Sequence, residues 1–219
     1  MRFLRCVHAE WLLLSPRLTR TRLGISLLLL AALLVWLNGR GLDPVTVAMQ
    51  AGALSSILGV SGLVGSGAER AALSVALTHP TTGLAIATGR WVTVVVPAAI
   101  VAIGATVVVG WHTTAAIAGV AAAAAVGSCA LVLVLAFGRG AAALLFLFMA
   151  VAGAITPERL VDMAHPGVVR LAMASTLELG PALWHYRDIA AGDLGAILHA
   201  VAWTGLGIVL SGGLVARRR

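Results

Sequence analysis

The chain has 219 residues, of which 60% are hydrophobic and only 11% are charged. A soluble domain is about 45–50% apolar and about 25% charged, so this composition leaves too little polar surface to cover a globule. It argues against a soluble enzyme, a disordered chain and a secreted disulfide scaffold, and it indicates an all-α membrane protein. The net charge is +7. Because cytoplasmic loops of membrane proteins collect positive charge, we interpret this excess as topology and expect no nucleic-acid partner.

All 15 basic residues are arginine, and the absence of lysine removes two kinds of chemistry. A Walker A phosphate loop needs its lysine on the β- and γ-phosphates, so this chain cannot carry a standard one. Lysine Schiff-base catalysis is excluded for the same reason. The two cysteines, Cys6 and Cys129, indicate neither a disulfide framework nor a zinc site.

The first element in chain order is an amphipathic helix over residues 1–22. Its apolar residues recur at helical spacing, and five arginines supply charge: Phe3, Val7, Trp11 and Leu14, with Arg2, Arg5, Arg17, Arg20 and Arg22. Such a helix lies at the membrane surface and leads into a span.

Six apolar segments follow, where one span needs about 20 apolar residues. They cover residues 23–37, 44–64, 91–111, 115–137, 141–155 and 194–216. Trp91 and Trp111 at the two ends of the third are typical of interface anchors. Pro97 inside it predicts a kink. No Asp, Glu or Arg falls inside the six segments, which argues against an ion or proton relay.

Alternate connections divide the charges unequally when the amino terminus is placed in the cytoplasm. The inside set then holds eleven arginines and two acids, net +9, and the outside set holds four arginines and six acids, net −2. The sequence therefore predicts six spans in the cell membrane, with both termini cytoplasmic. We expect one transmembrane domain over residues 1–219, with a cytoplasmic connection at 65–90 and an external segment at 156–193.

The external segment contains no charge-free stretch that is long enough to cross a bilayer. Pro157, Pro166 and Pro181 divide it into short pieces with apolar faces. We interpret these pieces as short helices that rest on the outer surface before the last span. His185 and Tyr186 fall in this segment, and we expect both to be solvated.

The cytoplasmic connection contains a short helix over residues 69–80. Glu69 near its amino end favours the helix dipole, and Pro80 terminates it. Leu73 and Leu77 are four residues apart and share one face. A leucine pair beside a charged pair suits the groove of a partner protein. The same pattern also fits an interfacial helix that only joins two spans.

Residues 69–80 read Glu-Arg-Ala-Ala-Leu-Ser-Val-Ala-Leu-Thr-His-Pro, and Gly89-Arg90 follows. This stretch resembles the signature of the ABC type-2 exporter permeases. That signature has an acidic and a basic residue, Gly-Thr, a leucine-rich turn and Thr-Ser-Pro, with Gly-Lys where the third span begins. The present sequence departs from it at Ala71-Ala72, His79 and Arg90. The amphipathic first helix, the six spans and the external helical segment match the plan of the family over the whole chain.

The resemblance implies that residues 69–80 form the coupling helix, which contacts an ATP-binding cassette ATPase subunit. The contact residues would be Glu69, Arg70, Leu73, Leu77, Thr78 and Pro80. ATP and Mg²⁺ would belong to that separate subunit, so this chain would hold no cofactor and would be a transport subunit, not an enzyme. The resemblance also implies a second permease copy or a related permease in the same bilayer, and export as the direction of transport.

In the same family the second span helps to line the translocation path. The candidates here are Met49, Gln50, Ser55 and Ser56, with Phe146 and Met149 from the fifth span. Interhelical hydrogen bonding and core packing are the alternative roles for these side chains. A path without charged side chains fits a small apolar or amphipathic cargo, and drugs, peptides, lipids and haem all remain open.

Two other classes of protein compete with the permease. Gly59-Val60-Ser61-Gly62 matches the nucleophile motif of rhomboid intramembrane serine proteases, with His199 as the possible base. However, the motif lies in the second span, and Ser61 and His199 are expected toward opposite ends of their spans. A non-transporting membrane scaffold or assembly factor is the second alternative.

Overall fold

A computed structural model of the protein describes residues 2–20, 29, 33, 36, 43–64, 82–145, 167–178 and 180–217. Within these residues the regular secondary structure is entirely helical. Four of the described helices are long and apolar enough to cross a membrane: α3 (Pro44–Leu63), α5 (Gly83–Val109), α6 (Thr113–Phe137) and α11 (Leu194–Ala216). The prediction of an all-α fold is therefore confirmed, and these four helices are the candidate membrane spans.

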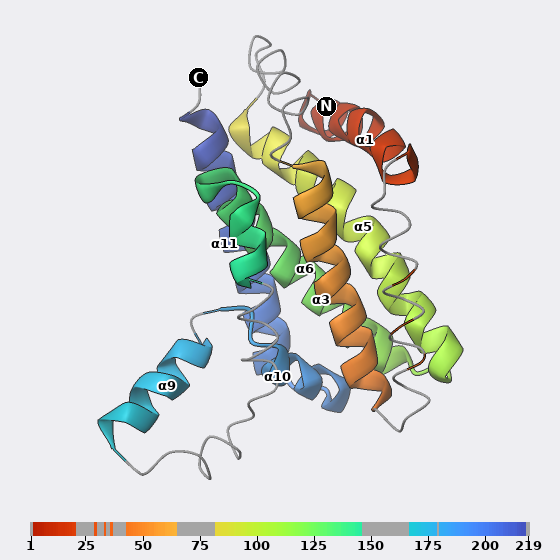
Figure 1. Ribbon diagram of the computed structural model, residues 1–219, viewed down its shortest axis with the longest axis vertical. Coiled ribbons are helices and arrows are strands. Elements are labelled where there is room, and N and C mark those ends of the chain that lie inside the picture. The colour runs from red at the N-terminus through yellow and green to blue at the C-terminus, as the bar shows by residue number, and fades with distance from the viewer. Residues whose placement is uncertain are drawn as a thin grey trace.

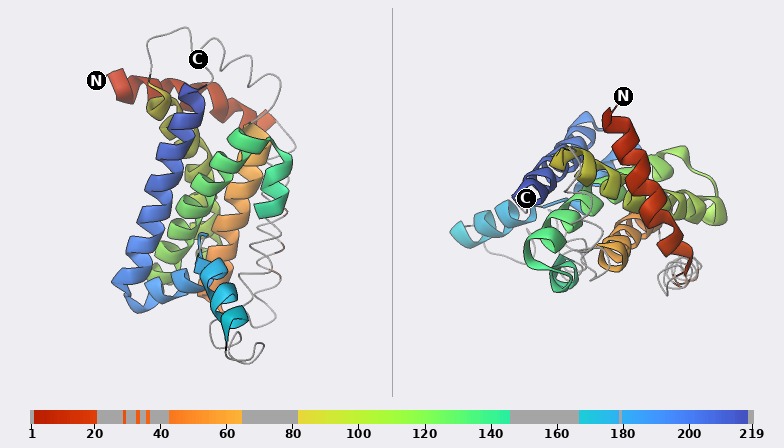
Figure 2. Two further views of the ribbon diagram at one scale, coloured as in Figure 1. Left: turned by 90° about the vertical axis from the view of Figure 1, so that its left-hand side faces the viewer. Right: turned by 90° about the horizontal axis from the view of Figure 1, so that it is seen from above.

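The four long helices run side by side, and shorter helices lie at both ends of the bundle (Figure 1). Helix α1 (Arg2–Arg20) crosses one end, which also holds the carboxyl terminus, and we name it the α1 end (Figure 2). The opposite end holds α10 (Leu183–Tyr186) and the 3-10 helix η1 (Arg187–Ala191), and we name it the η1 end. Helix α9 (Val168–Glu178) lies to one side of that end.

The four membrane-length helices correspond to the second, third, fourth and sixth expected spans. Most of the first and fifth expected spans lies outside the described residues, although residues 140–145 are helical. Leu29, Leu33 and Trp36 are helical as well, and each is exposed over half or more of its surface. Helices α9, α10 and η1 are the short helices expected between residues 156 and 193.

Three of the long helices begin at a side chain that caps them. Asp43 accepts a hydrogen bond from the Thr46 amide (3.2 Å) before Pro44 opens α3. Thr82 accepts one from the Ala85 amide (3.2 Å) at the start of α5. Asp193 accepts one from the Gly195 amide (2.8 Å) at the start of α11.

Helix α5 differs from the third expected span in its bounds and in the role of its tryptophans. It begins at Gly83, eight residues before Trp91, and therefore includes Arg90. It ends at Val109, so Trp111 lies beyond it and is exposed. Trp91 is not a free interface anchor, because its indole N–H donates to the Ala124 carbonyl oxygen of α6 (3.1 Å).

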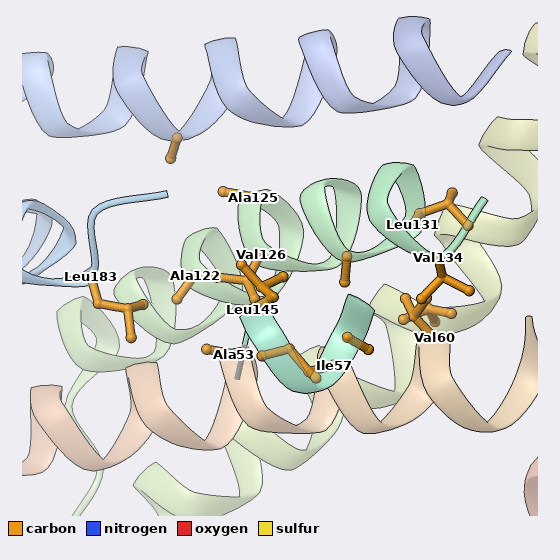
Figure 3. Close-up of a cluster of buried hydrophobic side chains, with 14 of the residues drawn as sticks. Ala53, Ile57, Val60, Ala122, Ala125, Val126, Leu131, Val134, Leu145 and Leu183 are labelled. Carbon is orange, nitrogen blue, oxygen red and sulfur yellow. The ribbon is translucent and has the colours of Figure 1, made fainter. Parts of the chain in front are cut away.

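The main apolar core lies where α3 faces α6 (Figure 3). Side chains from α3, α6, the helical residues 140–145 and α10 point toward one another there, and all are buried: Ala53, Ile57, Val60, Ala122, Val126, Val134, Leu145 and Leu183. Much of this contact surface is alanine, so dispersion between closely spaced backbones supplies a large part of the packing energy.

Glycines allow α6 to approach its neighbours closely. A Cβ atom at Gly52 of α3 would overlap the carbonyl oxygen of Gly119 in α6, and a Cβ at Gly119 would lie 2.8 Å from the Ala48 carbonyl oxygen. In a bilayer no solvent-driven hydrophobic force holds helices together, and small residues at the contact permit the tight packing that does.

The outward faces of α5 and α11 carry large exposed apolar side chains: Val96, Ile100, Val107, Val108, Leu194, Leu198, Val201, Val209 and Leu210. A surface of this kind is stable against lipid chains and unstable in water. The described helices therefore form a bundle whose outside matches a membrane.

Replacing Gly52 with alanine tests the close packing of α3 on α6. We expect Gly52→Ala to destabilise the protein by about 1–3 kcal/mol, because the new Cβ meets backbone that cannot rotate away. Gly104→Ala in α5 is the matched control, because a Cβ there has open space. Since alanine favours helix, the control should be neutral or stabilising. Thermal unfolding in detergent measures both, and equal midpoints would contradict the packing.

Candidate functional site

The candidate path residues of α3 are largely enclosed by the bundle, and one of them bonds to a neighbouring helix. Met49, Ser55 and Ser56 are buried, and Gln50 is half-buried. The Ser56 hydroxyl donates to the Ala123 carbonyl oxygen of α6 (2.8 Å), so this residue ties two helices together. The other two candidates, Phe146 and Met149, lie outside the described residues.

Two apolar cavities lie on either side of the contact between α6 and α11, which we name the α6–α11 seam. The first has a volume of about 310 Å³, and its walls include Cys129, Leu133, Leu145, Pro181, Trp203 and Leu206. The second has a volume of about 380 Å³, and its walls include Ile117, Ala124, Ile189, Ile197, Val201 and Thr204. Pockets of this size and character suit apolar ligands.

At the seam, one hydroxyl group bonds α6 to α11, and one glycine lets the two helices approach closely. The Ser128 hydroxyl lies within hydrogen-bond distance of the carbonyl oxygens of Trp203 (3.0 Å) and Ala125 (2.8 Å). A Cβ at Gly207 would lie 2.6 Å from the Ser128 side chain. The two helices therefore meet without space between them, and the cavities stay on separate sides.

An aromatic and histidine cluster lies where the seam reaches the η1 end. The Trp203 indole N–H donates to Nε2 of His199 (3.0 Å), so that imidazole nitrogen acts as an acceptor. The His199 ring lies 5.4 Å from that of His185 and 5.6 Å from that of Tyr186, measured between centroids. Trp184 extends the cluster through a 5.0 Å contact with His185.

The expectation that His185 and Tyr186 are solvated is wrong for Tyr186. Its side chain is fully buried, and burial, followed by the nearby Cys129 thiol, raises the pKa of its phenol. His185 is half-buried. The apolar stretch from Pro181 to Leu183 directly before these residues is the sequence signal that indicates a packed segment at this point.

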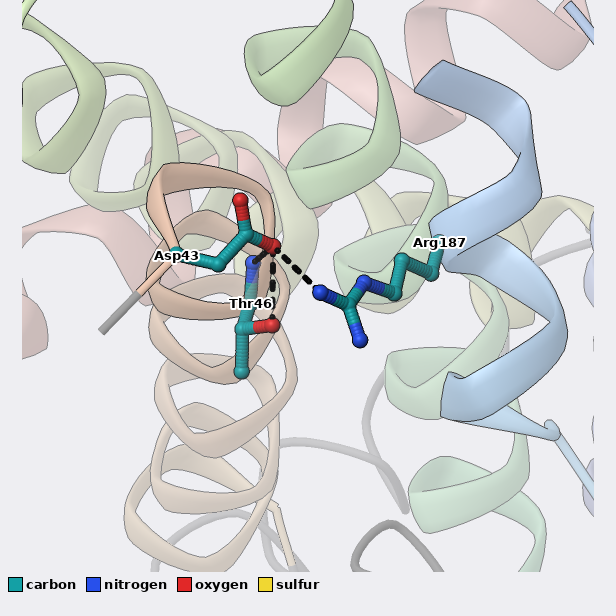
Figure 4. A network of polar contacts seen from close by, with 3 residues as sticks. All are labelled: Asp43, Thr46 and Arg187. Carbon is teal, nitrogen blue, oxygen red and sulfur yellow. Dashed lines mark hydrogen bonds and ion pairs between the residues drawn. The ribbon is translucent and has the colours of Figure 1, made fainter. Parts of the chain in front are cut away.

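An ion pair joins the start of α3 to η1 (Figure 4). One Arg187 guanidinium nitrogen lies 3.4 Å from the same Asp43 carboxylate oxygen that caps α3 and accepts from the Thr46 hydroxyl (3.1 Å). The two charged side chains are 55% and 37% exposed. Solvent therefore screens the attraction, and the pair orients η1 more than it stabilises the fold.

A second ion pair, at the α1 end, is buried. Nε of Arg90 in α5 lies 3.6 Å from a Glu10 carboxylate oxygen in α1, and the two side chains are 2% and 9% exposed. Gly89 makes room for Glu10, because a Cβ at that position would lie 2.6 Å from the Glu10 Cβ. Arg90 was expected in the connection before the third span. It lies inside α5 instead, where Glu10 balances its charge.

The predicted partner-contact residues fall outside the described residues. These are Glu69, Arg70, Leu73, Leu77, Thr78 and Pro80. The structure does describe the residues on either side of them, Val64 and Thr82. Arg139 donates from Nε to the Val64 carbonyl oxygen (3.3 Å), which fixes one boundary of the segment.

The structure does not bring Ser61 and His199 together. Ser61 lies in the last turn of α3, at the α1 end, and its hydroxyl donates to the Ile57 carbonyl oxygen of its own helix (2.8 Å). His199 lies in the second turn of α11, at the η1 end. A nucleophile and its base must be within hydrogen-bond reach, and these two are not.

The Ser56 hydrogen bond can be tested against Ser61. We expect Ser56→Ala to lower the free energy of unfolding by about 0.5–1 kcal/mol, the usual value of a hydrogen bond between membrane helices. Ser61→Ala, which removes a bond within one helix, should change it by less. Denaturant unfolding in mixed micelles measures both, and the reverse order would contradict an interhelical role for Ser56.

The buried ion pair predicts a larger effect. We expect Glu10→Gln to destabilise the protein by about 3 kcal/mol, because it removes the charge that balances buried Arg90. Arg5→Gln in the exposed face of α1 is the control and should change the stability by less than about 0.5 kcal/mol. A Glu10→Leu/Arg90→Met double variant should recover most of the loss. Thermal unfolding in detergent reports all three, and an unchanged Glu10→Gln midpoint would refute the role of the pair.

Comparison of the chain with models of known protein families and with characterised proteins finds no match. The argument for its function therefore comes from the sequence pattern and from the geometry described above.

Proposed function

We propose that this protein is the membrane-spanning permease subunit of an ATP-binding cassette exporter of the type-2 class. It moves a small apolar or amphipathic substrate outward across the cell membrane. The ATP and Mg²⁺ that drive transport are bound by a separate cassette ATPase subunit. The protein works as a pair with a second copy of itself or with a related permease.

The main support for this proposal is the position of Val64 and Thr82, the described residues on either side of the partner-contact segment. Helix α3 ends beside Arg139, and α5 begins beside the last turn of α11, where a Cβ at Gly83 would lie 3.2 Å from the Ala216 Cβ. Both boundaries are therefore at the α1 end, together with α1 and the carboxyl terminus (Figure 1). A coupling helix between α3 and α5 needs this arrangement, because an ATPase subunit can dock on only one side of a membrane.

The charges of the described residues support a cytoplasmic α1 end. That end holds seven arginines and one acid: Arg2, Arg5, Arg17, Arg20, Arg90, Arg139 and Arg217, with Glu10. The η1 end and α9 hold four acids and two arginines: Asp43, Glu178, Asp188 and Asp193, with Arg170 and Arg187. The positive-inside rule then favours a cytoplasmic location for both termini.

The proposed mechanism transmits motion from the ATPase to α5. ATP closes the paired cassette subunits, and Leu73 and Leu77 of the coupling helix follow the groove in which they are held. Helix α5 begins at Gly83, three residues after Pro80 and directly after the Thr82 cap, so it moves with the coupling helix. Because Arg90 is paired with Glu10, α5 and α1 move together. The spans then reorient and release the substrate outward.

The apolar cavities beside the α6–α11 seam support an apolar or amphipathic substrate. Both are partly open and are lined mainly by α6 and α11, so an apolar molecule could enter them from the lipid.

Co-purification tests the assignment. The tagged chain is expressed in its native host, extracted in detergent, and assayed for a bound cassette ATPase and for ATP hydrolysis. We expect the Leu73→Asp/Leu77→Asp variant to bind at most one tenth as much ATPase as the wild type does, because each aspartate places a charge in an apolar groove. Ala71→Asp/Val75→Asp is the matched control, with the same two charges on the opposite face of the expected helix.

The control should keep most of its ATPase and elute as a single species. Undiminished binding by the Leu73→Asp/Leu77→Asp variant would refute the coupling helix. A wild-type chain that is monodisperse and binds no cassette ATPase would refute the permease assignment.

A further inference from the structure

Three potential metal ligands converge at the η1 end. His185 comes from α10, Asp188 from η1, and Asp193 is the residue that caps α11. Each offers one ligand atom, and the three atoms lie within 4.8 Å of one another. We propose that they bind a divalent transition-metal ion, a role that does not depend on the transport function.

The backbone between η1 and α11 forces the two carboxylates together. Gly192 has a φ of 85°, in the left-handed region that glycine adopts without strain. Its amide donates to the Ile189 carbonyl oxygen (3.0 Å), and the Asp193 amide donates to the Asp188 carbonyl oxygen (3.1 Å). The chain reverses at this tight turn, and the reversal places Asp188 and Asp193 side by side.

The imidazole supplies an independent sign of a ligand. The His185 side chain is 23% exposed, but its Nδ1 atom is covered and has no hydrogen-bond partner among the residues that the structure describes. The Asp188 carboxylate oxygen closest to it is 3.8 Å away, which is too far for a hydrogen bond. Two ligands bound to one Zn²⁺ at about 2.0–2.2 Å lie about 3.4 Å apart in a tetrahedral site. The His185–Asp188 separation of 3.8 Å is close to this value, and the three ligand atoms lie within 4.8 Å of one another, so small side-chain rotations would bring all three onto one ion.

The charges around the three ligands favour a cation. Arg187, which lies between His185 and Asp188 in the sequence, is directed to Asp43 at 3.4 Å. Arg187 therefore does not neutralise the carboxylates of Asp188 and Asp193, and a bound cation would. Asp193 caps α11 with one carboxylate oxygen, Oδ1, and its second oxygen remains for a metal.

The donor set selects the class of ion. One imidazole nitrogen with two carboxylate oxygens suits Zn²⁺ and other first-row transition metals, whereas Mg²⁺ and Ca²⁺ prefer oxygen ligands alone. The Asp188 side chain is 53% exposed, so water can complete the coordination. A bound ion would join α10 and η1 to the first turn of α11.

Zinc titration of the full chain, purified without a histidine tag, tests the site. Trp184 is a built-in reporter, because its ring lies 5.0 Å from that of His185. We expect one Zn²⁺ per chain by calorimetry, with a matching change in tryptophan emission, and no response to Mg²⁺ at the same concentration. Failure of the wild type to bind Zn²⁺ below 1 mM would overturn the proposal.

Ligand variants separate the site from adventitious binding. We expect His185→Gln, Asp188→Asn and Asp193→Asn each to weaken Zn²⁺ binding by tenfold or more. Asparagine at 193 can still cap α11, so this change removes the charge and keeps the helix start. His112→Gln, an exposed histidine at the cap of α6 at the same end, is the control and should bind as the wild type does.

Unfolding temperatures measured without metal show whether each variant is folded. If the three ligand variants are folded and bind Zn²⁺ as tightly as the wild type does, the ion is adventitious and the proposal is wrong. A His112→Gln variant that loses Zn²⁺ equally would also refute it.

Discussion

The close approach of α6 to α3 and α11 is the constraint on which the rest of this bundle depends. In a bilayer, lipid chains are as apolar as leucine, so helices gain little by exchanging lipid for protein unless their backbones come very near. Glycine at 52, 119 and 207 permits that approach, and the hydroxyls of Ser56 and Ser128 bond across it. With α6 held between its neighbours, the apolar cavities are left at its flanks.

Two ion pairs secure the ends of the bundle, and their burial gives them different roles. The Asp43–Arg187 pair is exposed, so its loss changes the orientation of η1 more than the stability. The Glu10–Arg90 pair is almost fully buried, and neither charge is tolerated there without the other. The buried pair therefore couples α1 to the membrane-length helix α5.

Sequence reasoning predicted the membrane helices well where the signal is local. Apolar length identified α3, α5, α6 and α11, and turn and cap residues such as Asp43 and Asp193 mark their starts. It failed at the start of α5, because the third span was expected to begin at Trp91, after the charged Arg90. The carboxylate of Glu10, about eighty residues earlier in the chain, balances the charge of Arg90 inside that helix.

The sequence by itself determined that this is a helical membrane protein, because a chain with so few charges can cover its surface only with lipid. It also pointed to the partner-contact segment, because a leucine pair and a proline stop are local patterns. The tertiary structure decided which polar groups meet. It turned Ser56 toward α6, buried Tyr186, and gathered His185, Asp188 and Asp193 at one turn. Those contacts depend on how separate helices pack, and no periodicity within one helix encodes them.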